Sequence, residues 1–242
     1  SRQSEFKCDK MKVYLDNSTA DASSPGSLKR IELEGQKVVF EDKRFRPLEL
    51  LSLVNLECDG FDYDIENGLM TARGPGSIKV NNRDVKGSSS DKEISLAGPC
   101  YALIENFSIL TIDTNARRIT ADSDSQMVHV GYIPILPDGK TGTERLVDAG
   151  KFVIDYQQQQ DGRAKITAVN AAGKVHYYEP DKYQLIGDSF NYDSNTSMIV
   201  ISGTPGNPCV LNSTLVEGIE YNVLTGSIKS TISGVSNIPA NQ

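Results

Sequence analysis

The residues that could carry out chemistry in this sequence are few. Its two histidines, His129 and His176, each lie in a stretch where apolar and polar residues alternate. Such alternation is typical of a strand with one solvated face, so we expect both side chains to be structural rather than catalytic. The sequence contains no G-x-S-x-G, H-E-x-x-H or P-loop motif, the patterns that position a nucleophile, a zinc ion or a phosphate. We therefore expect a protein that is not an enzyme and that uses no cofactor and no metal ion.

Paired carboxylates are the other feature with chemical potential. Asp62 and Asp64 would share one face of a strand, where two carboxylates could bind calcium or cleave a glycosidic bond. The pattern recurs as Asn191 and Asp193, and each pair precedes a tight polar turn. Because Asp and Asn stabilise chain reversals by hydrogen bonding to nearby backbone groups, we interpret these residues as turn residues. A polysaccharide-active β-helix enzyme is the alternative that would use them in catalysis.

The four cysteines, Cys8, Cys58, Cys100 and Cys209, are far apart and include no C-x-x-C pair. They therefore lack the spacing of a structural zinc site. Four cysteines allow three disulfide pairings, and the sequence does not choose among them. No basic cluster surrounds them to stabilise a thiolate, so we expect buried or disulfide-linked thiols.

The overall charge narrows the class of partner. The chain of 242 residues carries 32 acidic and 25 basic side chains, for a formal net charge of −7. A phosphate backbone needs a basic stripe, so we expect no nucleic-acid partner. No apolar run approaches the roughly 18 residues that a membrane-spanning helix requires. We expect any signal segment or membrane anchor to precede Ser1.

Short alternating stretches dominate the rest of the chain and indicate strands with one buried face. They cover residues 12–15, 37–40, 107–112, 151–156, 165–169 and 198–201. Turn residues such as Asn and Gly lie between them. One helical turn is expected near residues 47–51. The sequence therefore predicts an all-β fold.

The chain also contains an internal repeat. Three copies cover residues 59–74, 187–203 and 217–234, and a fainter copy starts at residue 149. Each copy has an apolar-x-Tyr pair, a tight polar turn and an alternating return strand; the pairs are Phe61/Tyr63, Ile154/Tyr156, Phe190/Tyr192 and Ile219/Tyr221. Each unit predicts a β-hairpin with one apolar face. A single hairpin cannot bury that face, so the hairpins must stack.

These repeats resemble the OstA-like family of periplasmic lipopolysaccharide-transport proteins, which includes LptA, LptC and the amino-terminal domain of LptD. The matching residues are CDGFDYD at 58–64 leading to TARG at 71–74, GDSFNYD at 187–193 leading to ISG at 201–203, and an opening segment at 6–14, 31–35 and 38–40. The likeness covers residues 5–80 and 145–235. It predicts one OstA-like module at 1–90, elaborated middle strands at 91–144 and a second module at 145–242, or one continuous jellyroll.

The resemblance implies an OstA-like β-jellyroll (β-taco) of stacked antiparallel strands with an apolar groove. Such a protein would carry lipopolysaccharide acyl chains without catalysis, through the periplasm of a Gram-negative cell towards the outer membrane, either free or from an inner-membrane anchor. Acyl chains gain about 0.8 kcal/mol for each CH₂ removed from water. Other OstA-like proteins would associate through edge strands. The groove residues expected are Phe61, Tyr63, Met70, Phe152, Ile154, Tyr156, Ile166, Phe190, Tyr192, Val200, Ile219, Tyr221 and Ile228.

Two alternatives stay open from the sequence. Periodicity identifies a buried face but does not distinguish a face packed by neighbouring side chains from one that receives a ligand. The chain could therefore be a structural or adhesive β-repeat module, a β-helix or sandwich with a filled core and a protein or glycan partner. An error of one residue in the strand phase would also move each assigned side chain to the opposite face.

Overall fold

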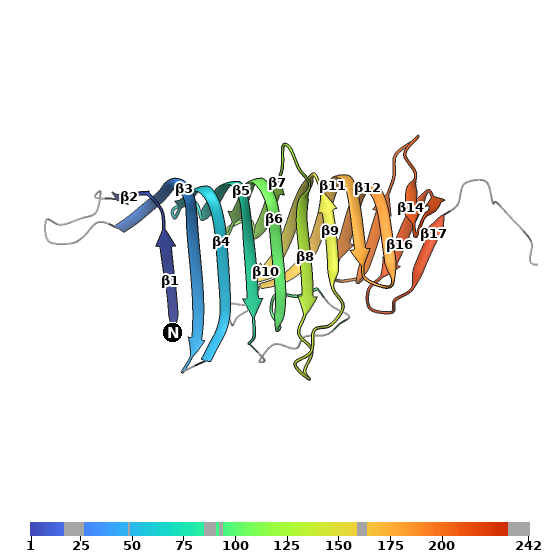
Figure 1. Ribbon diagram of the computed structural model, residues 1–242, viewed down its shortest axis with the longest axis horizontal. Coiled ribbons are helices and arrows are strands. Elements are labelled where there is room, and N and C mark those ends of the chain that lie inside the picture. The colour runs from blue at the N-terminus through green and yellow to red at the C-terminus, as the bar shows by residue number, and fades with distance from the viewer. Residues whose placement is uncertain (17–26, 48, 85–90, 92–93, 159–163, 232–242) are drawn as a thin grey trace, which may run out of the picture.

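The computed structural model describes residues 1–16, 27–47, 49–84, 91, 94–158 and 164–231. This part of the chain forms seventeen strands and no helix (Figure 1). It therefore holds no helix that could span a membrane. All strand pairings are antiparallel and join the strands in one hydrogen-bonded network. The predicted all-β fold is confirmed, and its architecture is jellyroll-like.

Six long strands organise the fold: β3 (Ser27–Arg46), β4 (Glu49–Asp64), β5 (Leu69–Asn82), β6 (Cys100–Asp113), β11 (Ala164–Glu179) and β12 (Tyr183–Asp193). The shorter strands are β1 (Arg2–Lys7), β2 (Lys10–Asp16), β7 (Arg118–Asp122), β8 (Val128–Pro134), β9 (Arg145–Ala149), β10 (Lys151–Gln158), β13 (Met198–Ser202), β14 (Cys209–Leu211), β15 (Thr214–Val216), β16 (Gly218–Asn222) and β17 (Ile228–Thr231).

The network folds into two facing sheets that share the long strands. The front sheet includes β1, β8 and β9, which lie nearer the viewer in Figure 1, and it continues through the first half of β12 to β14 and β15. The back sheet includes β2, β7 and β10 and continues through the second half of β12 to β13, β16 and β17. The first half of β3 pairs with β2 and its second half with β1. In the same way, β6 pairs first with β8 and then with β7. We call the line where the long strands bend, through Gly35, Gly74 and Gly173, the crease; the opposite edge is the rim.

Glycines at the crease permit a close approach between strands. The pairing of β5 with β6 shifts register between Arg73 and Gly76. A Cβ added to Gly76 would lie 2.4 Å from Cζ of Phe107, and one added to Gly74 would lie 1.9 Å from the Phe107 carbonyl oxygen. Both distances are far below van der Waals contact, so only glycine lets the buried Phe107 ring pack against the bend.

The repeated units are hairpins of the back sheet. They pair Asp64 with Leu69 in β4–β5, Asp193 with Met198 in β12–β13, and Tyr221 with Ile228 in β16–β17. The fainter copy forms β10–β11, with its turn at 159–163 outside the described residues. A further hairpin, β6–β7, occupies the same kind of position between β5 and β10. The sequence repeat did not reveal it because Leu110 and Ile112 stand where the other units have an apolar-x-Tyr pair.

The turns use the chemistry expected of Asp and Asn. Asp64 accepts a hydrogen bond from the Asn67 backbone N–H at 3.0 Å, and Asp193 accepts one from the Asn195 backbone N–H at 2.8 Å. Asp62 instead forms an ion pair with Arg30 on the outer face of the back sheet. The turn interpretation is thus confirmed for Asp64 and Asp193.

Two features of the fold cross the boundaries between the expected modules. Hydrogen bonding continues across the expected boundary at residue 144, because Arg145 of β9 pairs with Tyr132 of β8. The buried side chains also form one contiguous core cluster that includes residues before, within and after 91–144.

The helical turn expected near 47–51 is wrong: β4 begins at Glu49, which pairs with Arg46 of β3 across a short connection.

Candidate functional site

The side chains expected to line a groove lie, with one exception, on the inner faces of the two sheets. Eight of them are buried: Phe61, Phe152, Ile154, Ile166, Phe190, Tyr192, Ile219 and Tyr221. Four are partly buried: Tyr63, Met70, Tyr156 and Ile228. These side chains are therefore fully or partly buried between the sheets, and their neighbours determine what fills the space around them.

Val200 is the exception. Its neighbours Ile199 and Ile201 are completely buried, whereas Val200 is 37% exposed and faces outwards from β13. The turn before β13 ends at Ser197, so the return strand starts in the opposite phase to the one expected. Because strand side chains alternate, this shift of one residue moves Val200 to the outer face.

The space between the sheets is filled along the C-terminal half of the molecule. The Tyr177 ring from the front sheet stacks on Phe190 from the back sheet, with ring centroids 6.0 Å apart, and lies 6.3 Å from Tyr221. Glu179, with no exposed surface, accepts hydrogen bonds from the hydroxyls of Tyr177 and Tyr221 at 3.0 and 2.9 Å. The Lys182 ammonium lies 2.9 Å from the same carboxylate. The expected groove residues of this half are therefore core residues, and the prediction of an empty groove in this half is wrong.

The buried Glu179 carboxylate affects the ionisation of both tyrosines that contact it. Burial, reinforced by the neighbouring Glu179 carboxylate, raises the pKa of the Tyr177 hydroxyl well above its ordinary value. The same two causes raise the pKa of Tyr221. Both hydroxyls stay protonated and donate to Glu179, which keeps the buried carboxylate hydrogen-bonded.

At the other end of the molecule, the described residues leave the inner face uncovered. Met11, Val13 and Leu15 of β2 are 49%, 51% and 52% exposed, although they lie on the inner face of the sheet. This orientation follows from the pairing of Met11 with Leu33, which is completely buried. We call the inner-facing set Phe6, Met11, Val13, Leu15 and Phe40 the N-terminal mouth.

Aromatic rings form the floor of the N-terminal mouth. Phe6 of β1 stacks on Phe40 of β3 with centroids 4.8 Å apart, and Phe40 lies 6.2 Å from Phe61 on the opposite sheet. Phe6 and Phe40 are only partly buried, because β1 and β2 are the last strands of their sheets at this end. The mouth is thus an apolar surface between two sheets that no strand in the described part of the chain closes.

A small pocket lies on the rim side of Phe6 and Phe40. It has a volume of about 220 Å³ between the inner face of the front sheet and β11. The residues lining this rim pocket are Arg2, Asp42, Arg44, Ser52, Val54, Val80, Asn82, Leu96 and Ala164. Its lining combines charged and apolar side chains, in contrast to the purely apolar floor of the mouth.

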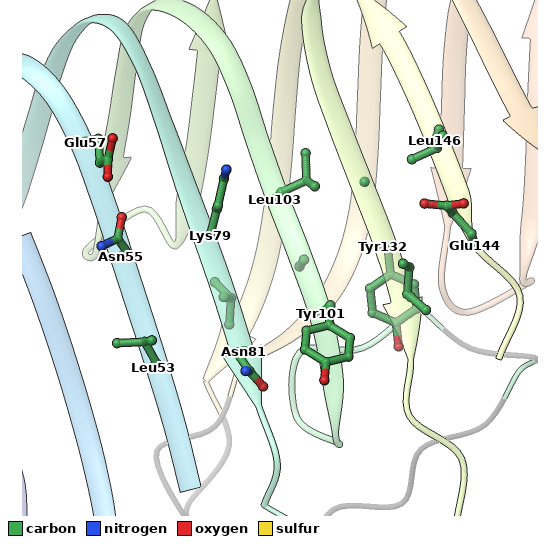
Figure 2. A pocket seen from close by; sticks show the side chains of 14 residues that line it. Leu53, Asn55, Glu57, Lys79, Asn81, Tyr101, Leu103, Tyr132, Glu144 and Leu146 are labelled. Atoms are coloured by element: carbon green, nitrogen blue, oxygen red, sulfur yellow. The ribbon is translucent and has the colours of Figure 1, made fainter. Parts of the chain in front are cut away.

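A larger groove of about 470 Å³ lies on the outer face of the front sheet (Figure 2). Leu103 and Leu146 lie on either side of Gly131, whose missing side chain leaves the floor open. A Cβ at Gly131 would come within 3.1 Å of Leu103 Cγ and 3.2 Å of Leu146 Cδ2. Tyr101 adds an aromatic wall, and Lys79 pairs with Glu105 at 2.9 Å beside it. Sequence reasoning missed this outer groove; its signal is the unbroken apolar run at 100–104, which leaves no polar face on the first five residues of β6.

The histidines lie on the same outer face, as expected for solvated strand positions. His129 Nδ1 lies 2.6 Å from Asp148 Oδ1, and His176 Nδ1 lies 3.9 Å from the other oxygen of that carboxylate. His176 Nε2 also contacts the Gln184 amide at 3.0 Å. Within the described residues, no three His, Cys, Asp or Glu side chains converge as metal ligands would.

The cysteines are all free thiols. Burial raises the pKa of Cys58 to about 11 and that of Cys100 to about 12. Burial likewise raises the pKa of Cys209. These three side chains are therefore neutral thiols at physiological pH, in line with the expected buried cysteines, and they are not poised for nucleophilic attack.

Comparison of the sequence with protein-family models and with curated proteins gives no match. The functional argument therefore rests on the geometry of the mouth, the rim pocket and the outer groove.

Proposed function

We propose that this chain is a non-catalytic, OstA-like lipid-binding module of a Gram-negative periplasm, which holds acyl chains of lipopolysaccharide or a related lipid and hands them towards the outer membrane. The observation that carries the proposal is the N-terminal mouth. Its apolar inner face, including Met11, Val13 and Leu15, is half exposed although the same face is covered along the rest of the sheets. Clustered apolar residues left in water mark a surface that binds a partner or ligand.

Burial of an acyl chain against the mouth is energetically favourable without any covalent step. Transfer of one CH₂ group from water to an apolar surface contributes about 0.8 kcal/mol, so an eight-carbon segment would contribute about 6 kcal/mol before the cost of ordering it. The stacked rings of Phe6 and Phe40 offer the flat apolar floor that such a segment needs. No covalent step is required, and the lipid can leave again.

The filled C-terminal half limits where the cargo lies. Of the side chains expected to line a groove, the partly buried Tyr63 and Met70 lie next to the mouth and keep that role in the proposal, whereas the buried Phe61 packs beneath Phe6 and Phe40. Phe190 and Tyr221 stabilise the core instead. A bound acyl chain would therefore occupy the end of the molecule formed by β1–β5 rather than its whole length.

Edge strands would let several chains associate end to end, so that lipid could pass from one chain to the next. Within the described residues, β1 and β2 each pair only with β3, whereas β15 pairs only with β14 and β17 only with β16. Each end of the molecule thus presents unpaired backbone N–H and C=O groups, which can pair with strands of another chain. We propose that other OstA-like proteins dock there and continue both sheets, which would cover the mouth and extend its apolar floor.

The test is a titration with a fluorescent acyl probe. The wild-type protein should show saturable uptake, and Val13→Asp should weaken it by about tenfold or more because a charge would face the apolar tail. Val200→Asp is the matched control: it makes the same substitution at an exposed strand position on the outer face. The control should bind like the wild type. Equal binding by all three proteins would exclude the mouth as the lipid site.

The filled interior favours a second candidate, a structural or adhesive β-repeat module. In that case the outer groove around Gly131 would contact a protein or glycan partner. The same titration separates the two functions, because a structural module would show no saturable acyl uptake. Leu103→Asp in the outer groove extends the test: loss of uptake in this variant alone would move the lipid site to the outer face.

A further inference from the structure

The inner face of β1 and β3 changes from apolar to charged between the crease and the rim. Three cross-strand pairs follow one another on this face: Phe6 with Phe40, Ser4 with Asp42, and Arg2 with Arg44. Phe6 and Phe40 face the buried Phe61 ring of the opposite sheet, and side chains two residues apart share a face. The surface is therefore graded like an amphiphile, with its apolar part at the crease and its polar part at the rim.

The rim pocket lies at the polar end of this gradient. Its apolar wall consists of Val54, Val80, Leu96 and Ala164, the last contributed by β11. Its polar wall includes Arg2, Asp42 and Arg44 from the graded face, together with Ser52 and Asn82. A ligand that fits both walls carries a polar group joined to an apolar chain.

The ion pairs around the pocket leave one guanidinium poorly matched. Asp42 accepts from Arg2 Nε at 2.8 Å and from the Ser4 hydroxyl at 2.6 Å. Asp84 lies 3.1 Å from Arg46 Nη2 but 3.5 Å from Arg44 Nη2, at the limit of a hydrogen bond. In these contacts three guanidinium groups share two carboxylates. The local excess of positive charge contrasts with the net charge of −7 for the whole chain.

Arg44 also holds an unused donor. Its Nε atom is buried and has no hydrogen-bond partner among the residues that the structure describes. A buried N–H without an acceptor is costly, and a shift of the Arg44 side chain, which is 34% exposed, towards a ligand oxygen would remove that cost. Arginine binds the oxygens of phosphate and carboxylate groups particularly well, because its N–H donors lie in one plane.

We propose that the rim pocket binds the anionic headgroup of an amphiphile, a phosphate or carboxylate, through Arg44, while the attached acyl chain runs along the graded face to Phe6 and Phe40. The proposal rests on the proposed function for the position of the tail, and it adds the class and orientation of the lipid. The headgroup lies at the rim, where it stays in contact with water, and the tail points towards the crease.

Calorimetric titration with three ligands tests the proposal: monododecyl phosphate, dodecanol and inorganic phosphate, the first two below their aggregation limits. The wild-type protein should bind dodecyl phosphate about tenfold more tightly than dodecanol, because a charge-assisted hydrogen bond adds to the same tail. Arg44→Gln should remove this preference and leave dodecanol binding unchanged. The preference should also decrease with salt.

Arg83→Gln is the matched control, because Arg83 is exposed and its Nε contacts Asn81 at 3.4 Å on the outer face. This variant should keep the preference, and thermal melting should show that both variants fold. Equal binding of the two dodecyl ligands by the wild type, or a preference that survives Arg44→Gln, overturns the headgroup site while acyl binding stands. Inorganic phosphate bound as tightly as dodecyl phosphate would overturn it in favour of a free-anion site. If neither dodecyl ligand binds, the proposed function fails as well.

Discussion

Phe190 distinguishes a packed interior from a vacant groove more directly than any other residue. Its ring is 3% exposed and stacks on Tyr177, and its strand neighbours on the same face are Ala171 and Ile201. Replacing Phe190 with alanine removes the ring and leaves a cavity, because Ala171 is too small to fill the space. Substitutions of this kind in packed cores cost about 3–5 kcal/mol.

A loss of this size is measurable without abolishing the fold. Domains are typically stable by about 5–15 kcal/mol, so Phe190→Ala should fold but unfold at a lower urea concentration. For a chain of this length, each kcal/mol lowers the melting temperature by about 2–4 °C, which predicts a decrease of about 6–20 °C. Phe190→Asp should fail to fold, because the interior offers its charge no partner.

Urea unfolding followed by circular dichroism is the appropriate assay, with Val200→Ala as the control. Val200 is exposed on the outer face, so this substitution should change stability by about 0.5 kcal/mol or less. The refuting result is a cost below about 1 kcal/mol for Phe190→Ala, accompanied by stronger uptake of an acyl probe. That outcome would mean that the Phe190 ring borders empty space and that the C-terminal half is a groove.

Two further predictions concern ionisation and thiol access. The pKa values of Tyr177 and Tyr221 are raised above their ordinary value of 10.0, so the folded state retains protons that the unfolded chain loses; the stability they contribute is complete below about pH 10 and decreases at higher pH. Urea unfolding at about pH 9 and about pH 11 checks this, and equal stability at the two values would contradict it. Cys8 is partly exposed whereas the other three cysteines are buried, so a thiol reagent should modify Cys8 quickly and Cys58 and Cys100 only on unfolding. Four equally fast thiols in the native protein would be inconsistent with the fold.

The sequence was sufficient to predict the hairpins of the back sheet because they depend on local interactions. An apolar-x-Tyr pair, a short polar turn and an alternating return strand together define strand, reversal and buried face. Asp64 and Asp193 hold their turns through contacts within three residues, which makes such units recognisable one at a time. The β6–β7 hairpin was missed because Ile112 replaces the tyrosine, although it folds in the same way.

The direction in which the Val200 side chain points could not be predicted from the local sequence. Whether Val200 or Ile199 faces inwards depends on how many residues the preceding turn uses, and the pattern MIVIS at 198–202 is apolar at both phases. Pairing with β12 and β16 decides the question, since Ile201 lies between Phe190 and Ile219 on the buried face. Likewise, Gly131 creates the outer groove only because Leu103 and Leu146 lie on the adjacent strands.

By itself, then, the order of residues determined that the chain forms strands, where many of them reverse and which side chains share an apolar face, because each of these properties depends on neighbours a few positions away. Whether that face is packed or open depended on the tertiary structure. Phe190 and Val13 both face inwards, yet Phe190 lies against Tyr177 and is 3% exposed, whereas Val13 is 51% exposed at the end where β2 is the last strand that the structure describes. Burial depends on what distant segments place opposite a residue, and only the folded chain brings those segments together.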